Sequence, residues 1–157
     1  MRYDIISDTH GYLSSALLEE LKGADVIVHA GDMCSVENWR ELKVIAPEFH
    51  MCLGNNDWDP YAYGPDARDL VGFFSEGLRW QICHYERKLK LGLCDIGICG
   101  HTHRPFVKRD AQTGALVMNP GSPTHPRGGF ASMGRIVVTD GQVVEARIIK
   151  LESESRW

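Results

Sequence analysis

The sequence is poor in the features that mark secreted, membrane-spanning or thiol-built proteins. Its five cysteines are an odd number and include no Cys-x-x-Cys pair, which argues against a disulfide framework and against a zinc ribbon. No apolar run approaches the roughly 20 residues of a membrane-spanning helix, and the first residues have no signal-peptide layout. We therefore expect a cytoplasmic protein that makes no contact with a membrane.

Positive charge is also scarce, since 17 Lys and Arg stand against 21 Asp and Glu, for a formal net charge of -4. Nucleic-acid-binding domains usually carry a basic stripe, so we expect no stable nucleic acid complex. The sequence contains no internal repeat, low-complexity segment or linker. With 157 residues, of which 43% are hydrophobic and 24% charged, it predicts a single globular domain spanning 1–157.

The first third of the chain alternates short apolar strands with amphipathic helices. Strands are predicted at three apolar runs, 3–7, 26–30 and 49–53. Helices are predicted over 13–22 and from Ser35, as N-cap, to Ile45. This β-α-β-α-β order is typical of a parallel sheet covered by helices.

The remainder of the chain is richer in strands. Further strands are predicted over 78–83, 96–99, 106–109, 115–119, 135–139 and 142–150. The last four pair as two hairpins, the second of which turns at Asp140-Gly141. The segment 58–65 predicts a long irregular loop, and 152–157 a polar tail. This half indicates a mixed sheet, or a second sheet that packs on the first.

Residues of the kinds that bind metal ions occur in five places along the chain. Four are short segments, Asp8-Thr9-His10, Gly31-Asp32, Gly54-Asn55-Asn56-Asp57 and Gly100-His101-Thr102-His103, and the fifth is a single histidine. Together they offer seven candidate ligands: Asp8, His10, Asp32, Asn55, His84, His101 and His103. Each of the five places follows the end of a predicted strand. Because the ligand crevice of an open α/β sheet lies at the carboxyl ends of its strands, we expect the segments to converge.

Aspartates and histidines without thiolates suit manganese, iron, zinc, cobalt or nickel. Asp8 and His10 stand two residues apart, as do His101 and His103. Each pair therefore points to one side of the chain if the strand geometry persists. The Asp32 carboxylate has two oxygens and can bridge two ions. The set predicts a site with two divalent transition-metal ions that share a carboxylate.

The charge of this predicted site favours an anionic substrate. Two divalent ions bring about +4, and two aspartates with one hydroxide remove three, which leaves about +1. Two ions about 3.5–4 Å apart can hold a hydroxide between them and clamp phosphate oxygens in line with it. The sequence therefore predicts attack of a metal-bridging hydroxide on phosphorus, without a covalent enzyme intermediate.

Each segment also has a structural explanation when it is taken alone. Asp8-Thr9-His10 is compatible with a helix N-cap, and Gly31-Asp32 and Gly54-Asn55-Asn56-Asp57 with ordinary turns. Two histidines in a glycine turn are rarely needed for packing. The common placement of all the segments at strand ends favours the metal site. His29 and His50 lie within predicted strands, and we expect them to be packed or surface residues.

Taken as a set, Asp-x-His, Gly-Asp, Gly-Asn-x-Asp, a strand-end His and Gly-His-x-His resemble the signature of the calcineurin-like metallophosphoesterase superfamily, specifically its compact YfcE-like phosphodiesterase family. The resemblance extends from Asp8 through Asn119-Pro120-Gly121-Ser122 to the last hairpin. It implies an α/β fold, a four-layer α/β/β/α sandwich of two mixed sheets flanked by helices. It also implies two divalent transition-metal ions, with manganese favoured over iron, nickel, zinc or cobalt.

The resemblance further implies a role for each matching residue. One ion would be bound by Asp8, His10, Asp32 and His103, and the other by Asp32, Asn55, His84 and His101. The residues predicted to act in catalysis are Asp32, Asn55, Asp57 and His101. Those predicted to contact the substrate are Asn56 and Arg127, the latter through a bidentate phosphate contact.

Two positions depart from the pattern of the family. Many members carry His or Cys where this chain has Asn56, and an asparagine is not a useful proton donor at neutral pH, so we expect no demanding leaving group. His84 is usually followed by Gly, whereas Tyr85-Glu86 predicts a bulkier and more acidic wall beside the second ion. The substrates of relatives therefore do not transfer to this chain.

The sequence as a whole predicts a metal-dependent phosphodiesterase that acts on a small or activated phosphodiester, and exposed apolar strands are compatible with a homodimer. A phosphomonoesterase or nucleotidase is one alternative. Another is a protein-binding scaffold, because the same fold serves that purpose in a retromer subunit whose metal ligands are degraded. All seven candidate ligands are present here, which favours the enzyme.

Overall fold

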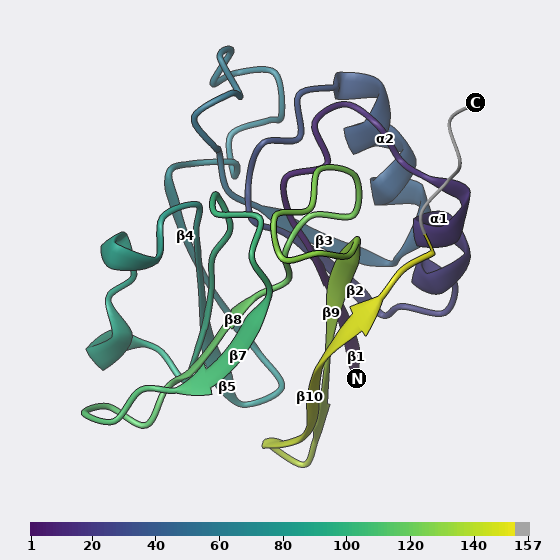
Figure 1. The fold of residues 1–157 in the computed structure, drawn as a ribbon. Helices are drawn as coiled ribbons and strands as arrows, with labels where there is room; N and C mark the ends of the chain where they lie inside the picture. The colour runs from purple at the N-terminus through teal and green to yellow at the C-terminus, as the bar shows by residue number, and fades with distance from the viewer. Residues whose placement is uncertain (153–157) are drawn as a thin grey trace.

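Two five-stranded sheets form the centre of the computed structural model, which describes residues 1–152 (Figure 1). The strands are β1 (Arg2–Ile6), β2 (Val26–His29), β3 (Glu48–Met51), β4 (Leu70–Ser75), β5 (Leu78–Cys83), β6 (Ile96–Ile98), β7 (Phe106–Arg109), β8 (Leu116–Asn119), β9 (Ser132–Thr139) and β10 (Gln142–Lys150). The first sheet has the order β10-β9-β1-β2-β3 and the second the order β4-β5-β6-β8-β7. Three neighbouring strands run parallel in each sheet, namely β1, β2 and β3, and β5, β6 and β8.

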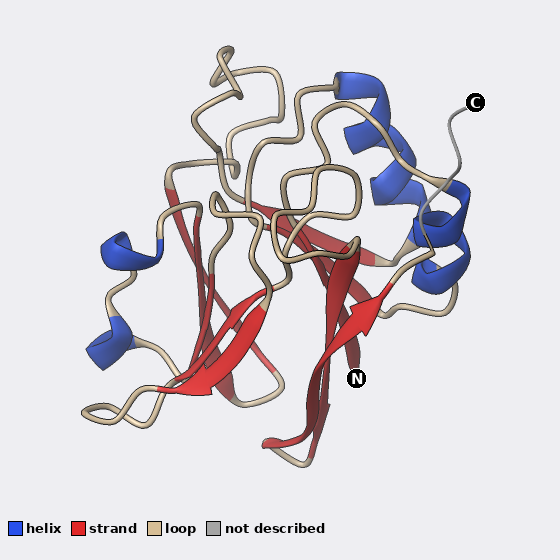
Figure 2. Ribbon diagram, in the orientation of Figure 1, coloured by secondary structure: helices blue, strands red, loops and turns tan. Residues whose placement is uncertain are grey.

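Helices cover the outer faces of the sheets, as Figure 2 shows. The helices are α1 (Ser15–Leu21), α2 (Val36–Ile45) and two single 3-10 turns, η1 (Glu86–Lys88) and η2 (Leu91–Leu93). The Ser14 hydroxyl accepts a hydrogen bond from the Leu17 N–H at 3.2 Å, and Ser35 caps α2 in the same way. These caps satisfy N–H groups that a helix start leaves unpaired. No helix of the described part of the chain is long and apolar enough to cross a membrane.

Buried side chains fall into three layers that match this arrangement. The layer between the sheets combines residues of both, among them Tyr3 and Ile5 of β1 with Trp80 and Ile82 of β5. Alternate residues of the first sheet, such as Ile6 and Ile27, face the other way and pack against the two α-helices. A small third cluster lies on the outer face of the second sheet. The predicted four-layer sandwich is therefore confirmed, with the fourth layer reduced to the two 3-10 turns.

The predicted elements correspond closely to those observed. Both predicted helices, the two hairpins and the irregular loop over 58–65 are present, and almost all strand boundaries agree with the predicted ones to within two residues. Strand β9 begins at Ser132, three residues before the predicted start. The part of the predicted polar tail over 153–157 lies outside the described residues.

One strand was missed by the sequence analysis, namely β4, which forms the edge of the second sheet. It pairs with β5 through a two-residue turn, Glu76-Gly77, in which both residues have positive φ. Such turns usually carry Asn or Asp at their first position. Glu76 occupies that position here, so the sequence did not predict a hairpin. Gly72 in the middle of the strand, where it weakens β propensity, masked the strand further.

Candidate metal centre

The candidate ligands lie on loops that follow the carboxyl ends of parallel strands in both sheets. Asp8 follows β1, Asp32 follows β2 and Asn55 follows β3 in the first sheet. His84 follows β5 directly, and His101 follows β6 in the second sheet. In Figure 1 these loops gather at the upper end of the two sheets, opposite the β9–β10 turn. Two sheets that pack face to face thus contribute to one place on the molecule.

The backbone at five of the seven candidate ligands is left-handed. The φ angles are 56° at Asp8, 48° at His10, 60° at Asp32, 71° at His101 and 59° at His103. The expectation that strand geometry persists within Asp-x-His and His-x-His is therefore wrong, because the chain has already turned out of the strand. Each non-glycine residue in this region costs about 1–2 kcal/mol. Such strain collects at functional sites that the surrounding contacts over-determine.

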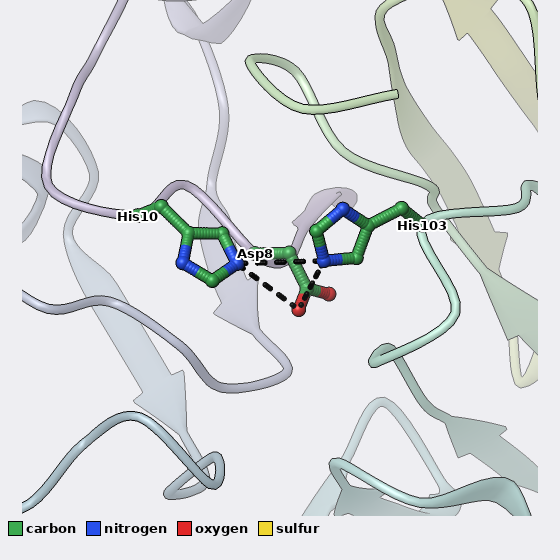
Figure 3. A group of neighbouring side chains, drawn as sticks. All are labelled: Asp8, His10 and His103. Carbon is green, nitrogen blue, oxygen red and sulfur yellow. Dashed lines mark hydrogen bonds and ion pairs between the residues drawn. The ribbon is translucent and has the colours of Figure 1, made fainter. Parts of the chain in front are cut away.

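The Asp8 carboxylate lies at the middle of the histidines. Its Oδ1 atom is 3.2 Å from His103 Nε2, 3.7 Å from His84 Nε2 and 3.8 Å from His10 Nε2. Figure 3 shows the His10 and His103 rings on either side of this carboxylate. Because the Asp8 side chain is fully buried, its charge is screened little by solvent.

The Asp32 carboxylate faces the same histidines from the second loop. Its Oδ2 atom lies 3.5 Å from His84 Nε2 and 3.6 Å from His10 Nε2. Burial alone would raise the pKa of Asp32, but the His84 ring and the N–H groups of Asn56 outweigh it and lower this pKa. Asp32 is therefore held as a carboxylate, the form in which it can bind a cation.

Two of the histidines are fixed in one orientation by backbone carbonyls. His84 Nδ1 donates to the oxygen of Ala30 at 2.7 Å, and His103 Nδ1 donates to the oxygen of His125 at 2.6 Å. The Nε2 atom of each ring is thereby directed at Asp8. Burial opposes the charged form of His84, but Asp32 and Asp8 raise its pKa, and Asp8 raises the pKa of His103. A carbonyl on one nitrogen and a free lone pair on the other is the usual arrangement of a metal-binding histidine.

The set of donors fits divalent metal ions. Two triads, Asp8–His10–His103 and Asp8–Asp32–His84, each bring their ligand atoms within 4.8 Å of one another. Among the described residues, the buried atoms Asp8 Oδ1 and His84 Nε2 have no hydrogen-bond partner. Buried polar atoms are normally satisfied, and ligands about 2.0–2.2 Å from one ion lie roughly 3 Å apart. The two unpartnered atoms and the spacing of the ligand atoms both match a site for cations.

Asn55 and His101 lie at the exposed rim of the centre. Asn55 Oδ1 is 3.2 Å from His101 Nδ1, and both residues are exposed. The pKa of His101 is lowered, first by burial and then by the neighbouring His84. The His101 N–H donates to Asp8 Oδ2 at 3.0 Å, which ties this rim to the buried carboxylate. The division of the seven ligands between two ions stays a prediction, and the structure adds that Asp8 belongs to both triads.

Asp57 and Asn56 act on Asp32 and its loop. The Asp57 carboxylate accepts from the N–H groups of Asp32, Gly54 and Cys34 at 2.8–2.9 Å. Asn56 donates its backbone and side-chain N–H groups to the two oxygens of Asp32, at 2.8 and 3.0 Å. These contacts hold the loops after β2 and β3 together. The predicted catalytic part of Asp57 and the predicted substrate contact of Asn56 stay predictions.

Two glycines of the motifs are required by close approach of neighbouring loops. A Cβ at Gly54 would lie 2.2 Å from Asp32 Oδ1, and a Cβ at Gly100 would lie 2.1 Å from Ser7 Oγ and 2.7 Å from Asp8 Oδ2. Any side chain at either position would push a carboxylate out of the centre. The glycine before Asn55 and the glycine before His101 are thus part of the geometry that positions the aspartates.

Several residues that position the centre were missed or given only structural roles by the sequence analysis. His29 is fully buried, and its Nδ1 accepts from the Gly31 N–H at 3.1 Å. Its Nε2 therefore carries the proton and donates to Thr9 Oγ1 at 2.9 Å. One histidine in β2 thus joins the loop of Asp8 to the loop of Asp32. The signal in the sequence was a polar residue at the end of an otherwise apolar strand.

Hydroxyl groups and one amide complete the frame around Asp8. Ser122 Oγ donates to the Asp8 backbone oxygen at 2.8 Å, and Thr124 Oγ1 donates to that of Thr9 at 3.0 Å. Ser7 Oγ donates to Asp8 Oδ2 at 2.6 Å. Asn119 Nδ2 donates to the Gly100 oxygen at 3.0 Å. The Asn119-Pro120-Gly121-Ser122 turn therefore braces two ligand loops.

The two remaining sequence-predicted features lie on opposite sides of the centre. Arg127 donates its backbone N–H to the His103 oxygen at 3.1 Å, and its exposed guanidinium makes no hydrogen bond or ion pair with a described residue. Tyr85 packs its ring against His101, with centroids 4.7 Å apart. The expected acidity of this wall is not observed, because Lys108 pairs with Glu86.

Two mixed sheets with aspartates, histidines and an asparagine at their strand ends define a metal-dependent phosphoesterase fold. The family model of the calcineurin-like phosphoesterase superfamily domain matches residues 1–141, and the chain belongs to this superfamily. A probable metallophosphoesterase of Methanothermobacter thermautotrophicus is 32% identical over 96% of this chain and 92% of its own length. A phosphodiesterase of Methanocaldococcus jannaschii is 27% identical over 97% of this chain and 100% of its own length.

Solved structures share the fold. An archaeal phosphodiesterase has a TM-score of 0.80 at 24% identity, covering 96% of this chain and 100% of its own. A Vps29 protein of Entamoeba histolytica, solved with zinc, has a TM-score of 0.70 at 20% identity, covering 96% of this chain and 99% of its own. The family supports a phosphoester hydrolase as the class of activity.

Proposed function

We propose that this protein is a phosphodiesterase that hydrolyses a small phosphodiester at two divalent transition-metal ions, with manganese favoured. The observation that carries the proposal is the pair of ligand triads that share Asp8. The buried atoms Asp8 Oδ1 and His84 Nε2 lie 3.7 Å apart, and neither has a hydrogen-bond partner among the described residues. A carboxylate common to both triads is what a pair of neighbouring ions requires.

When bound, two such ions supply a hydroxide nucleophile at neutral pH and stabilise the charge that develops on the phosphate oxygens. The protein contributes the geometry. Asp8 and Asp32 bring two negative charges to a buried place, and His84 and His103 are held by backbone carbonyls in the orientation that ligation needs. The exposed pair Asn55 and His101 leaves one side of the centre open to substrate.

A diester with a good leaving group is favoured as substrate over a monoester whose leaving group needs a proton. The N–H groups of Asn56 are engaged with Asp32, so this residue offers no proton to a leaving alkoxide. We further propose that the guanidinium of Arg127, whose backbone N–H donates to His103, donates to two oxygens of the substrate phosphate. The relative from Methanocaldococcus jannaschii that is 27% identical is named a phosphodiesterase.

The test combines metal content with paired substrates. Protein stripped with a chelator is reloaded with manganese, nickel, cobalt, iron or zinc, and hydrolysis of bis(p-nitrophenyl) phosphate is compared with that of p-nitrophenyl phosphate. We expect about two equivalents of metal by mass spectrometry and a higher kcat/KM for the diester. The variants Asp32→Ala and His84→Ala should lose hydrolysis, whereas His50→Ala, in β3, should keep it. Full activity of Asp32→Ala and His84→Ala would overturn the proposal.

The alternatives give different results in the same experiment. A monoesterase or nucleotidase would reverse the preference between the two substrates. A protein-binding scaffold, suggested by the fold shared with Vps29 proteins, would show no hydrolysis of either substrate with any ion, whether or not it binds metal.

A further inference from the structure

A pocket of about 510 Å³ adjoins the candidate metal centre on the side of His101. Its lining includes Tyr85, Glu86, Arg87, Leu89, Leu91 and His101. Small-molecule sites commonly have volumes of about 300–1,000 Å³. Because His101 belongs to both, the pocket begins where the metal centre ends. A substrate whose phosphate lies at the centre therefore places one of its ester groups in or beside this pocket.

The inner wall of the pocket is aromatic. The Tyr85 ring centroid lies 4.7 Å from that of His101 and 5.3 Å from that of His84. Tyr85 is thus packed against two candidate ligands and lies at a fixed position relative to them. Leu89 and Leu91 of the same loop add an apolar surface. Flat, apolar groups such as nucleobases favour surfaces of this composition.

Arg87 of the pocket lining and the adjacent Lys88 bring positive charge to one edge of the pocket. The Arg87 guanidinium carbon lies 5.0 Å from the Tyr85 ring centroid, and Lys88 Nζ lies 4.9 Å from it. The nearby Glu86 carboxylate is neutralised by Lys108, whose Nζ is 2.5 Å away. Two cations therefore stand beside the aromatic ring with no carboxylate left to balance them in this segment. An aliphatic ester group has no use for these charges, whereas a second phosphate does.

We propose that this pocket binds the nucleotide part of a phosphodiester substrate. The base lies against Tyr85 and the two leucines, and a phosphate other than the scissile one lies near Arg87 and Lys88. The inference rests on the proposed function, since it names the group attached to the phosphate that is hydrolysed. It makes Tyr85 and Arg87 residues that determine specificity, and it assigns them no part in the chemical step.

Three substrates with the same leaving group test this inference in the metal-loaded protein. They are methyl p-nitrophenyl phosphate, thymidine 5′-(p-nitrophenyl phosphate) and its 3′-phosphorylated form. Since p-nitrophenolate leaves in each case, differences in kcat/KM report the other ester group. From the energy of stacking one base on an aromatic ring, we expect thymidine to raise kcat/KM about 10-fold over methyl. The 3′-phosphate should raise it by about another 5-fold through charge-assisted contacts.

For the variants, the quantity to compare is the ratio of kcat/KM between two substrates, rather than kcat/KM for one substrate. If a change at Tyr85 disturbs His101, kcat/KM falls by the same factor for all three substrates. The ratios between substrates then stay the same. Tyr85→Ala should reduce the thymidine-to-methyl ratio to near one, and Tyr85→Phe should keep it. Arg87→Gln should abolish only the gain from the 3′-phosphate. Phe74→Ala, which removes an exposed aromatic of β4 outside the pocket, is the matched control and should change neither ratio.

The outcomes separate this inference from the proposed function. No hydrolysis of methyl p-nitrophenyl phosphate by the loaded protein contradicts the proposed function itself. Hydrolysis of that ester with a thymidine-to-methyl ratio near one in the unaltered protein overturns only the nucleotide pocket. Equal losses for all three substrates in Tyr85→Ala also overturn it, because they show that Tyr85 merely supports the neighbouring histidines.

Discussion

His103 directs its Nε2 atom at Asp8 Oδ1 across 3.2 Å, while its Nδ1 proton is committed to the backbone oxygen of His125. The ring cannot turn away without losing this hydrogen bond. Asp8 Oδ1 in turn has no hydrogen-bond partner among the described residues. The pair is therefore preorganised around a place for a cation, and a buried carboxylate there is costly until a cation neutralises it.

A first prediction concerns metal binding measured without activity. Metal bound to the folded state alone stabilises it by about 2.7 kcal/mol at a concentration of 100 times Kd. For a domain of this size we expect Tm to rise by roughly 5–10 °C when manganese replaces a chelator. Asp8→Asn should lose most of this rise, because it removes the carboxylate that both triads share. Thermal unfolding followed by circular dichroism measures the effect.

The control for this experiment is Asp69→Asn, which changes an exposed aspartate near the start of β4. It should keep the full response to manganese. If Asp8→Asn keeps the response as well, then Asp8 is not a ligand and the shared-carboxylate arrangement is incorrect.

A second prediction concerns the glycine before His101. In Gly100→Ala the new Cβ meets Ser7 Oγ and Asp8 Oδ2, so the Asp8 carboxylate must move. A displacement of about 1 Å at a catalytic centre costs on the order of 100-fold in rate, and we expect at least this loss in kcat/KM for an aryl diester. The measurement is steady-state kinetics at saturating manganese.

Gly92→Ala supplies the matched comparison, since a Cβ at Gly92 has no described atom within 4 Å of it and its φ is not positive. This variant should retain its activity. Equal activity of Gly100→Ala and Gly92→Ala would show that the loop relaxes without disturbing Asp8.

The positions of the candidate ligands were predictable because they depend on chain order and strand ends. Asp8 and Asp32 follow apolar runs that can only be buried strands, and parallel strands bring their carboxyl ends to one edge. Burial of Ile5 and Ile27 on opposite faces of the first sheet follows from the same patterns. The residue types along the chain were therefore enough to predict these strands and the edge of the sheet at which the candidate ligands lie.

The orientation of the side chains was not predictable in the same way. His10 and His103 turn inward through left-handed backbone, which histidine adopts more often than most residues but which a lone histidine does not predict. Likewise, Asp57 accepts from loops far from it in sequence, and His29 bonds to Thr9, 20 residues earlier. Such contacts depend on how two loops meet in space, and only the assembled fold determines them.

A third prediction concerns Asp57 as the link between two ligand loops. Its carboxylate accepts from three backbone N–H groups, whereas an asparagine has one oxygen and would direct its NH2 group at a donor. Leaving one buried donor unsatisfied costs about 1–3 kcal/mol. Asp57→Asn should therefore lower the free energy of unfolding by about 2 kcal/mol in urea denaturation of the metal-free protein.

Asp59→Asn changes a nearby exposed aspartate whose carboxylate, among the described residues, accepts from the Tyr61 N–H alone. Its free energy of unfolding should stay within about 0.5 kcal/mol of the unaltered protein. A similar small effect in Asp57→Asn would mean that the loops are held by other contacts.

The last prediction concerns pH and the buried His29. Burial lowers the pKa of His29 from 6.5 to about 4. Between these values the unfolded chain binds a proton that the folded chain does not, so the contribution of His29 to stability is lost as pH falls below 6.5. The slope for one such group is up to about 1.4 kcal/mol per pH unit. His29→Gln, which cannot titrate there, should be less stable at pH 7 but less sensitive to acid.

Urea denaturation at pH 7, 6 and 5 in a chelator measures this difference. Between pH 7 and pH 5 the unaltered protein should lose about 2 kcal/mol more than His29→Gln. His84 and His103, whose pKa values are raised, act in the opposite direction, gaining stability as pH falls. Both proteins share these two groups, so the difference between the curves isolates His29. Parallel curves would show that His29 takes up its proton in the folded state, and the link between Thr9 and Gly31 would then not require a neutral ring.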